Sequence, residues 1–526
     1  MKLYNNDIKR YNETSKQWKV VFLVNEIQIS EAKLIELYNQ GPEAVLKLVK
    51  ELYIGFNSLS AIGLEQRKCI EELTLSNLEM KAKIIELEAR LNKNSDNSSK
   101  PPSSDGYNKK TITNSREKSG RKTGGQPGHE GTTLNKVENP NKRIEIKVAD
   151  YCDCGQCLKD VTGNSKTRQV FDIPPINKIE VTEYLTEEKK CPICGKFHKT
   201  EFPAGVSKPT QYGENMKTLM AYFNDYQLLP LQRTVEAISD LTGQRISEGT
   251  IVNAGVQLQS SLKETLETIK EEIFNSDVVH FDETGIRIQG KTKWMHVACT
   301  ETSTYYEVND KRGIDAINDI GILREFTGTA VHDHWKPYYD FKNCTHSECN
   351  AHVIRYLKDI HQNYKQDWAC NMAGLLIELK RLVESLKTQG LTCMESQELE
   401  LWRNKYHKII SEGIIEDDEK SPKVFNKKGK LKNSKARQLL NRLGEYDIET
   451  LAFMYDFTIP FDNNLAERDL RMQKLRQKIS GCFRGKDGAN VFCDIRSYIS
   501  TARKRGYTAF EAIRNAIKGE PDISKA

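Results

Sequence analysis

Short apolar runs separated by polar turns mark the centre of the chain. The runs at 278–281, 294–298 and 304–308 have the composition and spacing of strands. A helical pattern at 314–323 comes next, and two further strand-like runs at 328–332 and 343–349 follow it. Three antiparallel strands, a helix and then a parallel strand predict a mixed α/β domain.

Carboxylates stand at the ends of two of these runs. Asp282 follows the first strand-like run, and Asp333 follows the fourth. A carboxylate at the end of a buried central strand is costly unless it is paired or binds a cation, so Asp282 is a candidate metal ligand. The alternative is an Asp that caps a turn at Gly285. The order of the elements is the ribonuclease-H-like pattern, which would bring Asp282 and Asp333 side by side on neighbouring strands.

Residues 352–460 are mostly helical and too long for a connection, which predicts a helical insertion. A helix after the insertion offers a third acid. Its candidates, with one that precedes the insertion, are Glu348, Asp462, Glu467 and Asp469. Glu467 and Asp469 lie about 200° apart around a helix, so they cannot both face one site. Charge and spacing alone leave this choice open.

The same helix is strongly basic. Lys474 lies seven residues after Glu467, two turns further on the same face, where it could contact DNA phosphate. The predicted DNA-binding residues are Arg468, Arg471, Lys474 and Lys478.

A heptad pattern begins at Ile70. Its a positions are Ile70, Asn77, Ile84 and Leu91, and its d positions are Leu73, Met80 and Leu87. An apolar seam that repeats every 3.5 residues predicts a coiled coil, and one Asn at an a position often fixes the register. We expect a homodimer or higher oligomer through this segment; the alternative is a helix that packs on its own chain.

Two CxxC pairs follow a polar stretch. Residues 93–143 have few large apolar side chains and eleven Lys or Arg against five Asp or Glu, which predicts a basic disordered linker, either docking on phosphates or simply solvated. The pairs, which can hold one structural Zn²⁺ between four sulfurs, are Cys154 with Cys157 and Cys191 with Cys194. Cys152 and His198 are possible substitutes among the ligands.

Helical patterns fill residues 208–270, and the second and third helices form a candidate helix-turn-helix for DNA or, equally, a packing element. The 526 residues include no apolar run of membrane-spanning length, so we expect no membrane partner and a cytoplasmic, nucleoid-associated protein. A net charge of +6 permits a polyanionic partner without requiring one.

Several motifs together resemble one family, the bacterial insertion-sequence transposases numbered sixty-six, within the DDE superfamily. They are NSSKPPSSD at 97–105, GGQPGH at 124–129, YQLLPL at 226–231, ISEGT at 246–250, DETG at 282–285 and DNNLAER at 462–468. Two positions depart from the family pattern: Asn350 stands where an aromatic residue is usual, and His334-Trp335 replace a glycine–aromatic pair.

The resemblance implies a catalytic triad of Asp282, Asp333 and Glu467 that binds two Mg²⁺ or Mn²⁺ ions. It implies a DNA transposase that cleaves the element ends and transfers the strands into target DNA. The alternatives are a non-catalytic DNA-binding regulator derived from such an enzyme and a ribonuclease-H-like nuclease.

The expected organisation is α/β, a ribonuclease-H-like catalytic core with a large helical insertion, preceded by a coiled coil, a zinc ribbon and a helical DNA-binding region. The boundaries are an N-terminal extension at 1–56, coiled coil at 57–93, basic linker at 94–147, zinc ribbon at 148–205, helical region at 206–273, core at 274–355 and 460–526, and insertion at 356–459.

Overall fold

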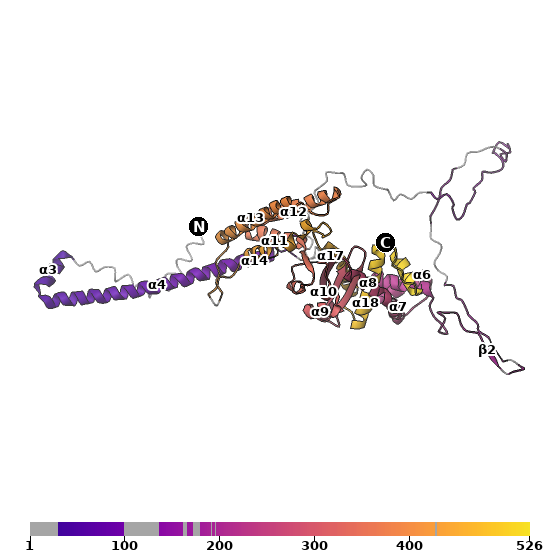
Figure 1. Ribbon diagram of the computed structural model, residues 1–526, viewed down its shortest axis with the longest axis horizontal. Coiled ribbons are helices and arrows are strands. Elements are labelled where there is room, and N and C mark those ends of the chain that lie inside the picture. The colour runs from indigo at the N-terminus through magenta and orange to yellow at the C-terminus, as the bar shows by residue number, and fades with distance from the viewer. Residues whose placement is uncertain are drawn as a thin grey trace. The chain divides into compact units, whose positions relative to one another are not determined.

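Five strands form one mixed sheet. The computed structural model of the chain, shown in Figure 1, describes residues 30–98, 136–160, 166–171, 179–190, 192–194, 196–426 and 429–525. The strands are β3 (Val278–Ile288), β4 (Lys291–Cys299), β5 (Thr304–Asn309), β6 (Thr329–His332) and β7 (Thr345–Glu348). Their order is β5-β4-β3-β6-β7, with β3, β4 and β5 antiparallel and β6 and β7 parallel to β3. The strand directions predicted from the sequence are therefore confirmed.

Strand β3 is longer than the sequence predicts. The pattern indicates a strand-like run at 278–281, but β3 continues to Ile288 because β4 pairs with it residue by residue, from His280↔Cys299 to Ile288↔Lys291. Gln289 and Gly290, with φ of 50° and 74°, make the turn. Parallel pairing with β6 ends at His280↔Val331. Asp282 thus lies just beyond the point where β3 and β6 stop pairing.

Gly328 allows β6 to enter the sheet. A Cβ at this position would lie 2.5 Å from the Asp277 carbonyl oxygen and 2.6 Å from the Phe326 ring, so no larger residue fits. The close approach lets Thr329 N donate to the same Asp277 oxygen at 2.7 Å. This contact helps to set the register of β6 against β3, and with it the position of Asp333.

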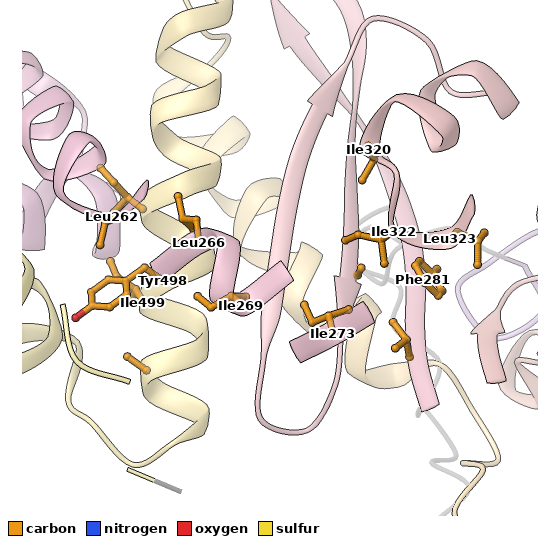
Figure 2. Packing of buried hydrophobic residues seen from close by; sticks show 14 of the residues in the cluster. Leu262, Leu266, Ile269, Ile273, Phe281, Ile320, Ile322, Leu323, Tyr498 and Ile499 are labelled. Carbon is orange, nitrogen blue, oxygen red and sulfur yellow. The ribbon is translucent and has the colours of Figure 1, made fainter. Parts of the chain in front are cut away.

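Side chains alternate across the sheet and feed two hydrophobic clusters. On β4, Ala298 belongs to one cluster, whereas Val297 and Cys299 belong to the other. The first cluster packs Phe281 against α8 (Lys263–Phe274), α9 (Ile314–Ile320), α10 (Ile322–Glu325) and α18 (Lys486–Lys504). Figure 2 shows Ile269, Ile322 and Tyr498 among its members. The second contains Ala466 and Leu470 of α17 (Asn464–Ser480), which places this helix against the sheet.

Helices precede the sheet, as the sequence predicts. They are α5 (Glu214–Ala221), a π-helical turn (Tyr222–Tyr226), α6 (Leu231–Thr242), α7 (Glu248–Ser261) and α8, while α19 (Ala509–Ile517) ends the chain's helices. Gly243, with φ of 70°, ends α6, and the Ser247 hydroxyl accepts from Thr250 N to cap α7. The α6–α7 pair is the candidate helix-turn-helix.

The segment between β7 and α17 is helical, as the sequence predicts. It contains α11 (Asn350–Tyr364), α12 (Trp368–Thr388), α13 (Ser396–Lys420), α14 (Lys435–Glu445), α15 (Asp447–Thr450) and α16 (Ala452–Tyr455). Buried aromatic residues hold parts of it together: Tyr406 is fully buried and donates to the Leu443 carbonyl at 2.9 Å.

The chain divides into two compact units, one comprising residues 1–93, 360–366 and 412–440 and the other the remainder. In the first, α3 (Glu31–Asn39) precedes α4 (Pro42–Leu91), a single long helix (Figure 1). The expected boundary between residues 56 and 57 falls inside α4. The heptad is visible only from Ile70 because Gly63 and Gln66 occupy the preceding a and d positions.

The expected linker begins with an ordered turn. Asn94 Oδ1 accepts from Asp96 N at 2.8 Å, and Asn97 Oδ1 accepts from Asn94 N at 2.9 Å. Residues 99–135, with most of the linker and two of its motifs, lie outside the described residues. None of the helices in the described part of the chain is both long and apolar enough to cross a membrane.

Candidate active site

Three elements bring the predicted acids toward one place. Asp282 lies on β3, Asp333 directly follows β6, and Glu467 lies in the first turn of α17. All three are partly buried. Because β3 and β6 are parallel neighbours, Asp282 and Asp333 emerge at the same end of the pair.

Each of the three carboxyl groups has a raised pKa, and the charges of neighbouring acids contribute to each shift. Burial raises the pKa of Asp282 well above its ordinary value, and the charges of Glu283, Asp333 and Glu467 raise it further. Burial and the charge of Glu283 raise the pKa of Asp333. Burial also raises the pKa of Glu467, and the charges of Asp462 and Asp333 add to that shift. Like charges gathered in a poorly solvated place are unfavourable without a counter-ion. The donor set, three carboxylates, suits Mg²⁺ or Mn²⁺.

Asn463 fastens α17 to the strands that carry the acids. Its side-chain amide donates to the Phe281 carbonyl at 2.8 Å, and its Oδ1 lies 2.7 Å from Nδ1 of the buried His280. Its backbone N–H donates to Cys349 Sγ at 3.1 Å, just beyond β7. These three bonds hold the start of α17, and so Glu467, beside β3 and the end of β7.

Glu283, the residue after Asp282, is paired with a cation and a hydroxyl group. Its side chain is 2% exposed and forms an ion pair with Arg312 at 2.6 Å, while the Tyr338 hydroxyl donates to its other oxygen. The Arg312 guanidinium also lies over the rings of Trp294 and Trp335, 4.9 and 4.3 Å from their centroids. The sequence indicates a carboxylate pair at 282–283 but not this division of roles, because the partners come from distant segments.

The other candidates for the third acid bind other residues. Asp469 forms an ion pair with Lys504 at 2.9 Å and accepts from the Thr304 hydroxyl at 2.9 Å. Glu348 is fully buried, and although burial acts to raise its pKa, hydrogen bonding to His334 and the charge of Arg442 hold that pKa down at about 2. Asp462 Oδ1 accepts from Asn464 N at 3.2 Å.

Glu467 has two further neighbours that could hold a metal ion, Cys349 and His352. The possible ligand atoms of these three residues lie within 4.8 Å of one another, and no other such group occurs in the part of the chain that the structure describes. Burial lowers the pKa of His352 to about 4, so its imidazole is neutral at pH 7. In this group the sequence predicts a role for Glu467 alone. Cys349 and His352, three residues apart, are a local signal for two of its members but not for their meeting with Glu467.

The four predicted DNA-binding residues, Arg468, Arg471, Lys474 and Lys478, are all exposed on α17. The charges of two of these residues and of the acids affect one another's pKa values. The charge of Arg471 acts to lower the pKa of Glu467. The exposed Lys474 amine is partly desolvated, which lowers its pKa, and the charge of Asp282 opposes this shift. The positive groups of α17 therefore adjoin the acidic site.

The CxxC segments form tight turns. Gly155 has φ of 87° and donates to the Cys152 carbonyl at 2.8 Å, and Tyr151 pairs with Cys157 across the turn. Cys194 lies between β1 (Glu188–Lys190) and β2 (Phe197–Lys199), which pair antiparallel, while Cys191 lies outside the described residues. Cys154, Cys157 and Cys194 are exposed free thiols. Residues 179–187, between the two pairs, are not part of a strand.

Comparison with known proteins gives one informative match. The family model described as the IS66 family of transposases matches residues 209–491, more than half of the 526-residue chain. A second model, described as a family of unknown function, matches residues 57–135. No curated protein matches the chain.

Three solved structures of Mos1 transposase complexes are also similar, at low scores. A pre-cleavage transpososome and a strand transfer complex match at 11% and 12% identity over 28% of this chain, with TM-scores of 0.11. A paired-end complex with the left transposon end matches at 13% identity over 31% of this chain, with a TM-score of 0.13. The matched regions span 61%, 60% and 66% of those chains, less than two thirds of each.

Proposed function

Because the chain belongs to the IS66 family of transposases, we propose that it cleaves DNA at the ends of its insertion sequence and joins them to target DNA. We assign both reactions to a ribonuclease-H-like core, with Asp282, Asp333 and Glu467 as the catalytic triad. The observation that supports this most is the electrostatic effect of Asp333 and Glu467 on Asp282, from elements β6 and α17 beside β3, where each carboxyl pKa is raised.

The three acids would hold two divalent ions, Mg²⁺ or Mn²⁺. Such ions, when bound, stabilise charge on the attacking and leaving oxygens of a phosphodiester. In the first reaction a water oxygen bonds to phosphorus, and the bond from phosphorus to the 3′ oxygen breaks, which leaves a 3′-hydroxyl at the element end. In the second, that 3′ oxygen bonds to a target phosphorus, and a target 3′-hydroxyl leaves. Neither reaction requires a covalent bond to the protein.

The cationic residues of α17 would bind the DNA backbone. Lys474 and Arg471 adjoin the acids, so they can hold the phosphates on either side of the scissile bond, while Arg468 and Lys478 extend the contact along the helix. This binding orients the strand and offsets its charge beside three carboxylates.

The direct test uses DNA that carries the two flanks of the protein's own gene. Purified protein with Mg²⁺ or Mn²⁺ is expected to nick this DNA at the element ends and to join the new 3′ ends to a second DNA. Binding without any cleavage would favour a regulator, and cleavage without joining would favour a nuclease.

We further propose one structural zinc ion per chain, held by Cys154, Cys157, Cys191 and Cys194. Cys191→Ser is expected to lower the bound zinc to well below one per chain because a tetrahedral site loses one of four ligands. Metal analysis of the purified variants measures this. The exposed Cys69, on α4 and outside both pairs, gives the matched control Cys69→Ser. Full zinc content in Cys191→Ser would contradict the four-sulfur site.

We also propose that α4 pairs with a second copy of the chain as a coiled coil. Its seam residues Ile70, Leu73 and Ile84 are 63%, 59% and 54% exposed. In the same register, Val49, Leu52, Phe56 and Leu59 continue the apolar positions toward the start of the helix, and they are exposed too.

The change Leu73→Glu with Ile84→Glu is expected to convert the oligomer to a monomer, since it places charges inside the seam. Sedimentation of the full chain measures the molecular mass. Leu75 is 48% exposed but lies two positions past the seam residue Leu73, so Leu75→Glu is the matched control and should leave the oligomer intact. A wild-type chain that sediments as a monomer at high concentration would contradict the proposal.

A further inference from the structure

His352 and Glu467 face each other with polar atoms that lack partners. Nδ1 of His352 and Oε1 of Glu467 are both buried, and neither has a hydrogen-bond partner among the described residues. The two atoms lie 3.5 Å apart, and the side chains are 14% and 24% exposed. Buried polar atoms are nearly always satisfied, so two adjacent exceptions indicate something that binds between them.

The spacing fits two ligands of one cation. A divalent ion about 2.1 Å from each atom separates them by about 3.4 Å in tetrahedral geometry and by about 3.0 Å in the octahedral geometry of Mg²⁺ and Mn²⁺, so the two atoms would move about 0.5 Å closer around such an ion. Arg355 approaches the other oxygen of Glu467, Oε2, at 3.8 Å, which leaves Oε1 directed at His352. Cys349 Sγ lies in the same group, but it already accepts the Asn463 N–H at 3.1 Å, and a sulfur ligand does not suit Mg²⁺ or Mn²⁺.

We propose that His352 is a direct ligand, through Nδ1, of the divalent ion that Glu467 holds. This inference rests on the proposed function, in which Glu467 binds such an ion. An imidazole nitrogen adds affinity for first-row transition ions, whereas Mg²⁺ keeps to oxygen ligands. The active site therefore binds Mn²⁺ in preference to Mg²⁺, and His352 sets this preference. An all-carboxylate triad would lack that source of selectivity.

The test uses the full-length chain without DNA, and Mn²⁺ is the probe. Pulsed electron paramagnetic resonance is expected to detect an imidazole nitrogen coupled to the bound Mn²⁺ in the wild type and to lose this coupling in His352→Ala. Titration should show Mn²⁺ affinity falling at least about tenfold in the variant, with Mg²⁺ affinity changed by less than about threefold. His352→Gln keeps most of the side-chain volume and should give the same result if His352→Ala does not fold.

Two controls separate a ligand from a residue that only orients Glu467. His407, 42% exposed and paired with Asp447, provides the control His407→Ala, which should keep the nitrogen coupling. A coupling that persists in both His352 variants, or Mn²⁺ and Mg²⁺ affinities that fall equally, would overturn the assignment. Equal loss of Mn²⁺ in Cys349→Ser would also overturn it, because the site would then depend on the thiol.

The inference and the proposed function can fail separately. A chain that shows the His352-dependent coupling but cleaves no DNA with any divalent ion would refute the transposase mechanism alone. A chain that cleaves and joins DNA without that coupling would refute the ligand assignment alone.

Discussion

Asp282→Asn and Asp333→Asn are each expected to reduce DNA cleavage by more than about a hundredfold. Loss of a residue that only hydrogen-bonds to a metal ligand typically costs about ten- to a hundredfold, and a direct ligand should cost more. Each change replaces an ionised oxygen donor with a neutral amide, at a site where charge on the carboxylates is what attracts the cation. DNA binding should survive, because the exposed cationic residues of α17 are unchanged.

Stability measurements distinguish this loss from misfolding. Without metal, each carboxyl pKa is raised by burial, so replacing one acid with a neutral amide should not lower the melting temperature. Mg²⁺ should stabilise the wild type through binding, by about 2.7 kcal/mol at a hundred times its dissociation constant, and stabilise both variants much less.

The matched control is Asp277→Asn. Asp277 is exposed and directly precedes β3, and in this region of the structure its role is a backbone contact, the carbonyl that accepts from Thr329 N at 2.7 Å. This variant should cleave like the wild type. Near-normal turnover by Asp282→Asn or Asp333→Asn under Mg²⁺ would remove that acid from the site.

The sheet could be predicted because its signals are local. Apolar runs, the glycine before β6 and the acids at strand ends are visible within a few residues, and the helix between β5 and β6 requires a parallel return. The length of β3 could not be predicted. Its second half, from Glu283 to Ile288, is polar enough to read as a loop, and only pairing with β4 makes it a strand.

The proposed site could be derived from the sequence only in part, for the same reason. Asp282 and Asp333 carry a local signal, whereas Glu467 could be chosen over Asp469 only from the family resemblance. The features that distinguish these residues are contacts across long sequence separations, such as Asp469 with Lys504 and Thr304. The group formed by Cys349, His352 and Glu467 depends on α17 returning to β7 after more than a hundred residues, which no local pattern encodes.

Glu467→Gln is expected to eliminate both cleavage and strand transfer. Glu467 Oε1 is buried without a hydrogen-bond partner in the described structure, and the group adjoins Asp333 and Asp282. An amide cannot supply the anionic oxygen, and both reactions are assigned to the same ions. Because burial raises the pKa of Glu467, the neutral glutamine should be tolerated in the fold, so the melting temperature of the metal-free variant should not fall.

Asp469→Asn is the matched control, two positions along the same helix, and its effect should be the converse. Removing the carboxylate leaves the Lys504 ammonium, 14% exposed, without its anionic partner, although that ammonium still donates to the Thr300 carbonyl at 2.7 Å. We expect a loss of stability of about 1–3 kcal/mol, because a hydrogen bond between two charged groups is replaced by a weaker bond to a neutral amide. Cleavage per folded molecule should remain measurable, because no atom of Asp469 is assigned to the metal site.

A Mg²⁺-dependent end-cleavage assay, run beside thermal unfolding of the same samples, separates the two roles. Glu467→Gln should lose activity and keep stability, and Asp469→Asn should lose stability and keep activity. If instead Asp469→Asn is inactive while folded and Glu467→Gln still cleaves, the third acid is Asp469, and its pairing with Lys504 must open when DNA binds.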